Sequence, residues 1–185
     1  MRLFIATSFP PEVLRDLNDR VAQFKQRLPA ASWVRPETQH LTFAFLGEHP
    51  DSLIDGLDGP LKSALAKIPS FEATLHGGGF FPNPRHARVG WVGLEPEAKF
   101  AEVARVVREV VMKHGVELDG GEFKAHLTML RVRDPWPPAS IDLFCKSLKD
   151  YTSAPFTVDR ITLYSSQLSP KGAIHTAQGH YPLAS

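Results

Sequence analysis

The chain has 185 residues, of which 43% are hydrophobic and 22% charged, as is typical of a globular protein with one domain. Its formal net charge is only +1, so overall charge does not indicate a nucleic-acid-binding protein. No stretch approaches the run of about 18 apolar residues that a membrane-spanning helix needs. The single cysteine, Cys145, excludes an intramolecular disulfide and fits a reducing cytoplasm.

Apolar residues recur with helical periods in some segments and with strand periods in others, which predicts a chain that contains both helices and strands. The opening residues read as a strand rather than a signal peptide because their apolar stretch is short. Strands are expected at 3–8, 33–34, 39–46, 71–75, 87–94, 124–131, 156–164 and 173–180. Helices are expected at 10–28, 100–111 and 141–148, with a kinked helix or two short ones over 53–65. The glycines at 77–79 are expected in a turn, and residues 165–172 in a loop.

The order of these elements bears on the class of fold. Several strands follow one another without an intervening helix, and the strands look half-buried rather than uniformly apolar. Both features favour an α+β fold with largely antiparallel sheets over a doubly wound parallel sheet.

One four-residue motif occurs twice, at His40–Phe43 (HLTF) and at His126–Met129 (HLTM). Alternation along a strand places the histidine and the threonine of each copy on one face. The histidine of a single such motif is more often a half-buried structural residue. Two copies fit a duplicated half-domain that carries a functional site. Two facing copies would supply a general base, a general acid and two hydroxyl donors, which suits in-line attack on a phosphodiester without a metal.

Arg131 follows the second copy and is a candidate phosphate clamp. Strict alternation places it on the face opposite His126 and Thr128, so it would need a bulge or the end of the strand to reach a substrate. The alternative is an arginine that braces the strand by pairing with a carboxylate. His40 and His126 could also share a metal ion, but no carboxylate lies at a recognisable ligand spacing, so no metal site is predicted.

These residues resemble the two-histidine (2H) phosphoesterases, and within them the RNA 2′,3′-cyclic phosphodiesterases, also called 2′-5′ RNA ligase-like proteins. The resemblance runs over almost the whole chain and includes, beside both motifs, segments 2–6, 33–34, 80–85, 88–93, 163–166 and 170–172. It implies a single domain over residues 1–185 made of two pseudo-symmetric lobes. In that fold two largely antiparallel sheets surround a central cleft, helices lie on the outer faces, and each lobe holds one motif.

The resemblance also implies a reaction, the hydrolysis of a 2′,3′-cyclic phosphate at an RNA 3′ end to a 2′-phosphomonoester. His40 would donate a proton to the departing 3′-oxygen and His126 would activate water, while Thr42, Thr128 and Arg131 would bind the substrate. No cofactor and no metal are expected. The expected partner is RNA with that terminus, such as a tRNA fragment, bound by a monomer in the cytoplasm. Some members run related chemistry backwards and form 2′-5′ linkages, and the sequence leaves this open.

Two alternatives stay open at this point. The chain could act on a small cyclic phosphate or a 2′-5′ oligonucleotide, or it could be a non-catalytic module that binds RNA ends. A substrate of several nucleotides needs a basic track leading from the cleft. The candidate residues for such a track are Lys124, Arg85, Arg88, Arg131 and Lys171. The alternative for each is a solvated surface charge without a substrate contact. Members of the family often have an aromatic residue near position 175, where this chain has His175.

Overall fold

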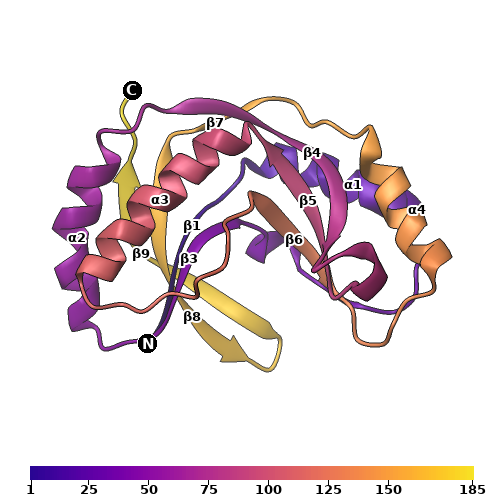
Figure 1. Cartoon of the computed structure of the whole chain (residues 1–185), viewed down its shortest axis with the longest axis horizontal. Coiled ribbons are helices and arrows are strands. Elements are labelled where there is room, and N and C mark those ends of the chain that lie inside the picture. The colour runs from indigo at the N-terminus through magenta and orange to yellow at the C-terminus, as the bar shows by residue number, and fades with distance from the viewer.

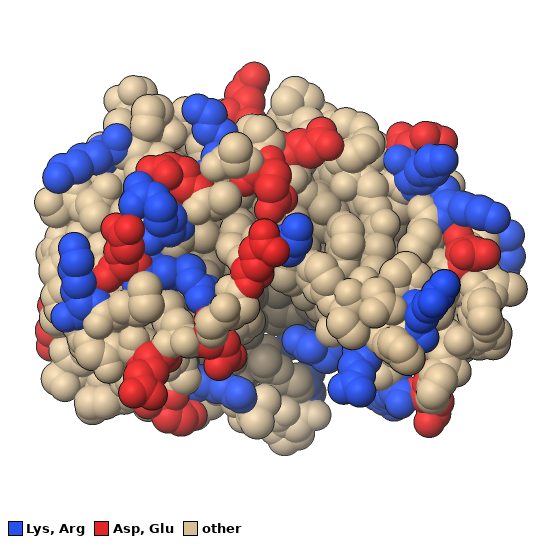
Figure 2. Space-filling model, viewed as in Figure 1, with Lys and Arg blue, Asp and Glu red and all other residues tan.

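The computed structural model describes all 185 residues, which form two antiparallel sheets on either side of a hollow (Figures 1 and 2). The first sheet has the order β3-β1-β8-β9 and contains β1 (Arg2–Thr7), β3 (Leu41–Glu48), β8 (Arg160–Ser169) and β9 (Gly172–Pro182). The second has the order β2-β6-β5-β4-β7 and contains β2 (Ser32–Trp33), β4 (Phe71–Phe81), β5 (Val89–Glu95), β6 (His126–Arg131) and β7 (Phe156–Val158). The predicted α+β fold with antiparallel sheets is confirmed.

Four α-helices cover the outer faces of the sheets (Figure 1). The helices α2 (Ser52–Leu65) and α3 (Glu97–Lys113) pack on each other and on the first sheet, and together they form the first lobe. The helices α1 (Pro11–Lys25) and α4 (Pro138–Lys149) pack on each other beside the second sheet and complete the second lobe. Two short 3₁₀ turns, η1 (Pro36–Thr38) and η2 (Pro84–His86), lie in connections. None of these helices has both the length and the apolar content that crossing a membrane requires.

The chain exchanges helices between the lobes. The helix α1 follows β1 of the first lobe but packs in the second, and α3 follows β5 of the second lobe but packs on β3 of the first. The two lobes therefore share one apolar core of 41 buried residues. In the second lobe, for example, the buried ring of Phe144 on α4 lies 4.9 Å from Phe80 of β4 and 6.2 Å from Phe24 of α1, measured between ring centroids. This shared core fixes the two sheets relative to each other.

Residues 53–65, where glycine and proline indicated a kink or a break, form the single helix α2. The expectation of two short helices is wrong because Leu57, Leu61 and Leu65 are fully buried along one face. That burial outweighs the missing amide proton of Pro60, which leaves the carbonyl of Gly56 without its helical partner.

The triple glycine lies inside β4 rather than in a turn, so that expectation is also wrong. Gly77 has a φ of +67° at a bulge in the pairing of β4 with β5, a conformation that favours glycine. At Gly79 a β-carbon would lie only 2.5 Å from the indole ring of Trp91 on the neighbouring strand. The glycines therefore allow the strand to bulge and make room for Trp91, whose ring packs 5.1 Å from that of Phe81.

The C-terminal strands differ from the expected pattern in two places. The strand expected over 156–164 divides at Asp159, because β7 pairs with β4 of the second lobe whereas β8 pairs with β1 of the first. Residues 165–172 are not a long loop, since β8 and β9 continue as a hairpin to Ser169 and Gly172. The hydroxyl of Ser169 stabilises the turn by donating to the carbonyl of Gly172 at 2.6 Å. Gly172 itself has a φ of +113°, a conformation that favours glycine.

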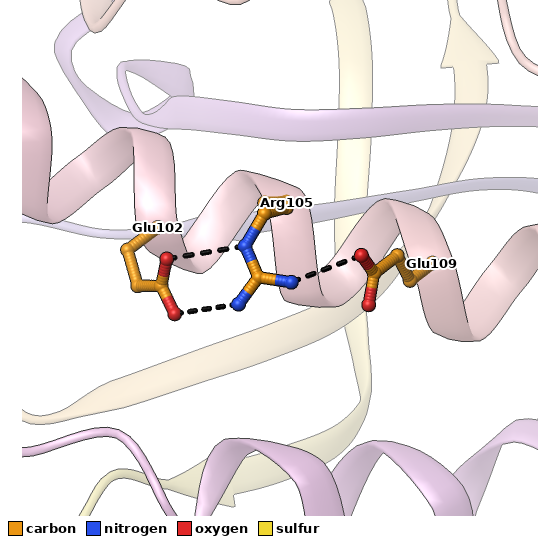
Figure 3. A network of polar contacts seen from close by, with 3 residues as sticks. All are labelled: Glu102, Arg105 and Glu109. Atoms are coloured by element: carbon orange, nitrogen blue, oxygen red, sulfur yellow. Dashed lines mark hydrogen bonds and ion pairs between the residues drawn. The ribbon is translucent and has the colours of Figure 1, made fainter.

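A polar network on the exposed face of α3 supports that helix (Figure 3). The Nε and Nη2 atoms of Arg105 donate to the two carboxylate oxygens of Glu102 at 3.2 and 2.7 Å. Its Nη1 donates to Glu109 at 2.9 Å. These contacts lower the pKa of Glu102 and raise that of Arg105. Because the partners are three and four residues away on the same helix, the network is a surface support for α3.

Candidate active site

A cavity of about 510 Å³, called the cleft below, opens between the lobes, where Figure 2 shows the surface hollowed. Of the predicted site residues, His40, Thr42, Thr128 and Arg131 all line it. The complete lining is Arg2, Leu3, Phe4, Val34, Thr38, His40, Thr42, Phe45, Gly47, Thr128, Arg131, Ser166, Leu168, Ala173 and His175. The two copies of the motif therefore meet at one cavity although they belong to different sheets.

Sheet topology explains why the two motif strands can meet. The strand β3 is an edge strand of the first sheet. The strand β6 is covered on its outer side only by the two residues of β2, which pair with Leu130 and Arg131. The amide of Val34 also donates to the carbonyl of Met129 at 2.8 Å, but the earlier motif residues from His126 to Thr128 have no partner from β2, and β3 and β6 contact each other directly.

Both motif strands contain a bulge at the same place. In the pairing of β3 with β1 the residue Phe43 has no partner, and in the pairing of β6 with β5 the residue Met129 has none. These are the fourth residues of the two motifs. A bulge inserts one extra residue and shifts the alternation of side chains by one position. Two consecutive buried residues therefore follow the threonine in each strand, and the next side chain is exposed.

This shift brings Arg131 to the cleft. Strict alternation from Thr128 would place Arg131 on the other face, and the bulge at Met129 returns it to the side of Thr128. The expectation from strict alternation is thus wrong for the reason anticipated, a bulge. In the first lobe the corresponding position is occupied by Phe45, which is 71% exposed and also lines the cleft. The third residue after the motif threonine is therefore a cation in one strand and an aromatic ring in the other.

His40 lies among aromatic rings at the start of β3. Its ring stacks on that of Phe4 at 5.0 Å, lies 5.8 Å from that of Tyr164, and meets that of His175 edge-on at 4.9 Å, measured between centroids. Burial, and secondly the neighbouring His175, lowers the pKa of His40 to about 4. In the free protein His40 is therefore neutral near pH 7, and an approaching negative charge favours its protonation.

His126 is half-buried at the start of β6, two residues before Thr128, and is not itself among the residues that line the cleft. Its Nδ1 lies 2.8 Å from the carbonyl oxygen of Lys124, so Nδ1 carries the proton and donates it to that oxygen. The ring of Phe81 packs at right angles to it, with 4.9 Å between centroids. These contacts fix the ring and leave the lone pair on Nε2.

The pKa of His126 is lowered as well. Burial is the main cause, and the positive charge of Arg131 acts in the same direction. The carbonyl of Lys124 and the carboxylate of Glu97 oppose the shift. His126 is therefore neutral near pH 7, and its Nε2 is available to accept a proton.

Sequence reasoning did not find the contact between His175 and His40. The pairing of β9 with β8, and of β8 with β1, brings His175 beside Phe4 and His40. It also did not find Arg35, whose Nη2 donates to the carbonyl of Ala173 at 3.0 Å and so ties the segment before the first motif to β9. Both depend on contacts between distant segments, and strand alternation alone does not predict them.

Replacing His175 by phenylalanine is expected to raise the pKa of His40. The substitution keeps an aromatic ring against His40 but removes the positive charge that His175 can carry, which is one of the two causes of the lowered pKa. Because burial is the larger cause, the pKa should stay below the ordinary 6.5. Titration of the histidine ring protons by NMR measures this, with His114→Phe as a control outside the cleft. An unchanged pKa for His40 would mean that the two rings are not electrostatically coupled.

No group of three or more His, Cys, Asp or Glu side chains is arranged so that it could hold a metal ion. The polar side chains of the cleft carry hydroxyls, guanidinium groups and imidazole rings, and the imidazoles are neutral near pH 7. Such a set can bind an anion and exchange protons with it.

The chain is similar to known proteins over most of its length. A family model described as the 2′-5′ RNA ligase superfamily matches residues 9–169. A Thermus thermophilus protein named RNA 2′,3′-cyclic phosphodiesterase is 35% identical over 192 residues, covering 99% of this chain and 90% of that protein. A Thermotoga maritima protein of the same name is 31% identical over 178 residues, covering 95% and 91%.

Solved structures extend the comparison to the fold. The crystal structure of the Thermus thermophilus protein TT0787 matches with a TM-score of 0.78 and 30% identity, covering 98% of this chain and 97% of that one. The crystal structure of Escherichia coli LigT complexed with 3′-AMP matches with a TM-score of 0.77, covering 100% and 98%. At 24% identity this second likeness concerns the fold alone.

Proposed function

Since the chain belongs to the 2′-5′ RNA ligase superfamily, we propose that it is a phosphodiesterase that opens the 2′,3′-cyclic phosphate at an RNA 3′ end to a 2′-phosphomonoester. The relatives that carry the name of this activity cover nearly the whole chain. The single observation that carries the proposal is that residues of both motifs, from different sheets, line one cleft together with Arg131.

The reaction requires one proton acceptor and one proton donor on opposite sides of phosphorus. The free Nε2 of His126 takes a proton from water as the water oxygen attacks phosphorus, because Nδ1 already donates to the carbonyl of Lys124. The bond from phosphorus to the 3′-oxygen breaks, and His40 gives its proton to that oxygen. The phosphate then remains on the 2′-oxygen, and each histidine returns to its starting state by exchanging a proton with solvent.

His40 must be protonated before it can act as the acid, although its pKa in the free protein is about 4. The cyclic phosphate carries a negative charge, and a negative charge next to an imidazole raises its pKa. Substrate binding therefore favours the protonated form of His40.

Three further side chains hold the phosphate in this proposal. The hydroxyls of Thr42 and Thr128 donate to non-bridging oxygens from the two lobes, and Arg131 offers a planar pair of donors to the same oxygens. Donors that are fixed in place before the reaction stabilise the charge that builds up on these oxygens in the transition state. Because the acid, the base and the anion-binding groups are all side chains, the reaction as proposed requires no metal ion or cofactor.

Product analysis tests this proposal directly. The protein is incubated, with EDTA present, with an RNA oligonucleotide that ends in a 2′,3′-cyclic phosphate, and the products are separated from authentic 2′- and 3′-phosphates. We expect a 2′-phosphate and no effect of EDTA. A 3′-phosphate would keep the reaction class but exchange the roles of His40 and His126. Activity that EDTA abolishes and added metal restores would refute the metal-free mechanism, and no turnover would refute the proposed activity.

The same groups would catalyse ligation, in which the 5′-hydroxyl of a second RNA replaces water in the attack on phosphorus and the bond to the 3′-oxygen breaks. Adding an RNA with a free 5′-hydroxyl to the same incubation tests this reaction. A product with a 2′-5′ linkage would establish ligation, and its absence would limit the activity to hydrolysis.

A further inference from the structure

A second cavity of about 500 Å³ lies in the second lobe, beside the cleft, and is called the arginine pocket below. It is formed by the connection between β4 and β5 and by the connection between β6 and α4. Its lining is Arg85, His86, Ala87, Arg88, Val132, Arg133, with Pro135, Trp136 and Ile141 completing an apolar wall. Three arginines thus share a cavity with an apolar surface.

The pocket is strongly basic in a protein that is almost neutral overall. No carboxylate lines it, and none of Arg85, Arg88 and Arg133 takes part in an ion pair. Figure 2 shows Lys and Arg gathered at the lower right rim of the hollow, over this part of the second lobe. Since the net charge is only +1, three unpaired guanidinium groups in one cavity form a local site for anions.

The backbone that carries these arginines is held in place. The side chain of Asn83 accepts from the amides of Arg85 and His86 at 2.9 and 3.1 Å. The carbonyl of Arg88 accepts from the amide of Val132 at 2.8 Å, so the two connections are tied to each other. A fixed backbone lowers the entropic cost of ordering these side chains around a ligand.

The pocket continues from the cleft along the chain. Arg131 lines the cleft and Arg133, two residues later, lines the pocket. Two residues span at most about 7 Å of chain, so the backbone positions of these two arginines lie close together and the arginine pocket adjoins the cleft. The Nε of Arg133 donates to Ser32 of β2 at 2.8 Å, which leaves its terminal nitrogens free.

We propose that the arginine pocket is a second substrate site that holds the phosphates of the nucleotides preceding the cyclic phosphate. Guanidinium groups bind phosphate with paired donors, and their planes stack on unpaired bases. Trp136 is buried in the wall, with its Nε1 directed to the carbonyl of Ala30, so it supports the cavity and does not stack on a base. This inference rests on the proposed function and makes the substrate an RNA of several nucleotides rather than a small cyclic phosphate.

The test compares substrates of increasing length with the same end. Cytidine 2′,3′-cyclic phosphate is compared with a dinucleotide, a tetranucleotide and a hexanucleotide that end in that same nucleotide. We expect kcat/KM of the protein to rise by about tenfold or more from the mononucleotide to the tetranucleotide. In Arg85→Gln/Arg88→Gln/Arg133→Gln this gain should be lost, while kcat/KM for the mononucleotide changes by less than about twofold.

A matched control removes the same amount of charge from the first lobe. Lys62→Gln/Lys67→Gln/Lys113→Gln changes exposed side chains of α2, its C-terminal end and α3. This variant should keep the gain with length. Salt supplies a second measure, because each lost phosphate contact should reduce the slope of log affinity against log salt by about 0.7 for a single strand.

The outcomes separate this inference from the proposed function. If the mononucleotide is hydrolysed but length brings no gain, or if both triple variants lose the gain equally, the arginine pocket is not an RNA site and the proposed function stands. If no substrate is turned over, the proposed function fails. In that case binding of oligonucleotides with a terminal 2′-phosphate, measured with the same variants, still decides whether the pocket takes RNA.

Discussion

Replacing His126 by alanine is expected to lower kcat for RNA 2′,3′-cyclic phosphate hydrolysis by about 10²–10⁴, and His40→Ala should have an effect of similar size. Each substitution removes one of the two proton transfers on which the proposed reaction depends. Single-turnover rates with saturating protein measure the chemical step itself. His114→Ala, on the outer end of α3, is the control and should retain full activity.

The two histidines can be told apart by the leaving group. An aryl phosphodiester substrate releases an aryl oxide, which leaves as a stable anion and needs no proton. It should therefore restore most of the rate of His40→Ala but not of His126→Ala. Near-normal turnover of the RNA substrate by either variant would contradict the two-histidine mechanism. Thermal unfolding of each variant is measured in parallel, because the His40 ring packs on Phe4 and its loss also removes a stacking contact.

The pH dependence of the unmodified protein belongs to the same prediction. The profile of kcat/KM reports the free protein, in which the pKa values of both His40 and His126 lie below the ordinary 6.5. A neutral base and a protonated acid are both required, so kcat/KM should be bell-shaped with its maximum below about pH 6.5. The profile of kcat should lie at higher pH, because the bound phosphate raises the pKa of the histidine that protonates it.

Much of the fold was predictable because local patterns and long-range packing agree. Three of the four helices and the two motif strands follow the periods of their apolar residues, as in α1, where Val13, Leu17, Val21 and Phe24 are buried along one face. The expectations failed where a contact between distant segments decided the outcome. The glycines of β4 stay in a strand because Trp91 of β5 fills the space above Gly79, and no local pattern predicts that contact.

In the candidate site, too, local patterns predicted some residues and contacts between distant segments determined the others. The repeated motif placed His40, Thr42, His126 and Thr128 on two strands, and the sheets bring three of these four to the wall of one cavity. The lowered pKa of His40 depends on Phe4 and His175, which the topology of the first sheet brings beside it. The arginine pocket includes Arg133, which belongs to no motif in the sequence. The fold alone brings the connection between β6 and α4, which carries Arg133, beside the connection that carries Arg85 and Arg88.

Arg131→Ala is expected to lower kcat/KM by about 10²–10³, the usual loss when one donor to a developing oxyanion is removed. The side chain reaches the cleft only because Met129 forms a bulge, so its contribution depends on a backbone feature and not on the motif itself. Arg131→Lys should recover part of the loss, since it keeps the charge but not the planar pair of donors.

A shift in pH dependence distinguishes this role from a structural one. Arg131 lowers the pKa of His126, so removing its charge should raise that pKa in Arg131→Ala but less in Arg131→Lys, as measured by NMR titration of the His126 ring protons and by the pH profile of kcat/KM. An arginine whose charge is neutralised by pairing with a carboxylate to brace β6 would reduce stability without changing this pKa. If Arg131→Ala keeps both the rate and the pH profile of the unmodified protein, Arg131 does not contact the phosphate, and the hydroxyls of Thr42 and Thr128 must hold it without the arginine.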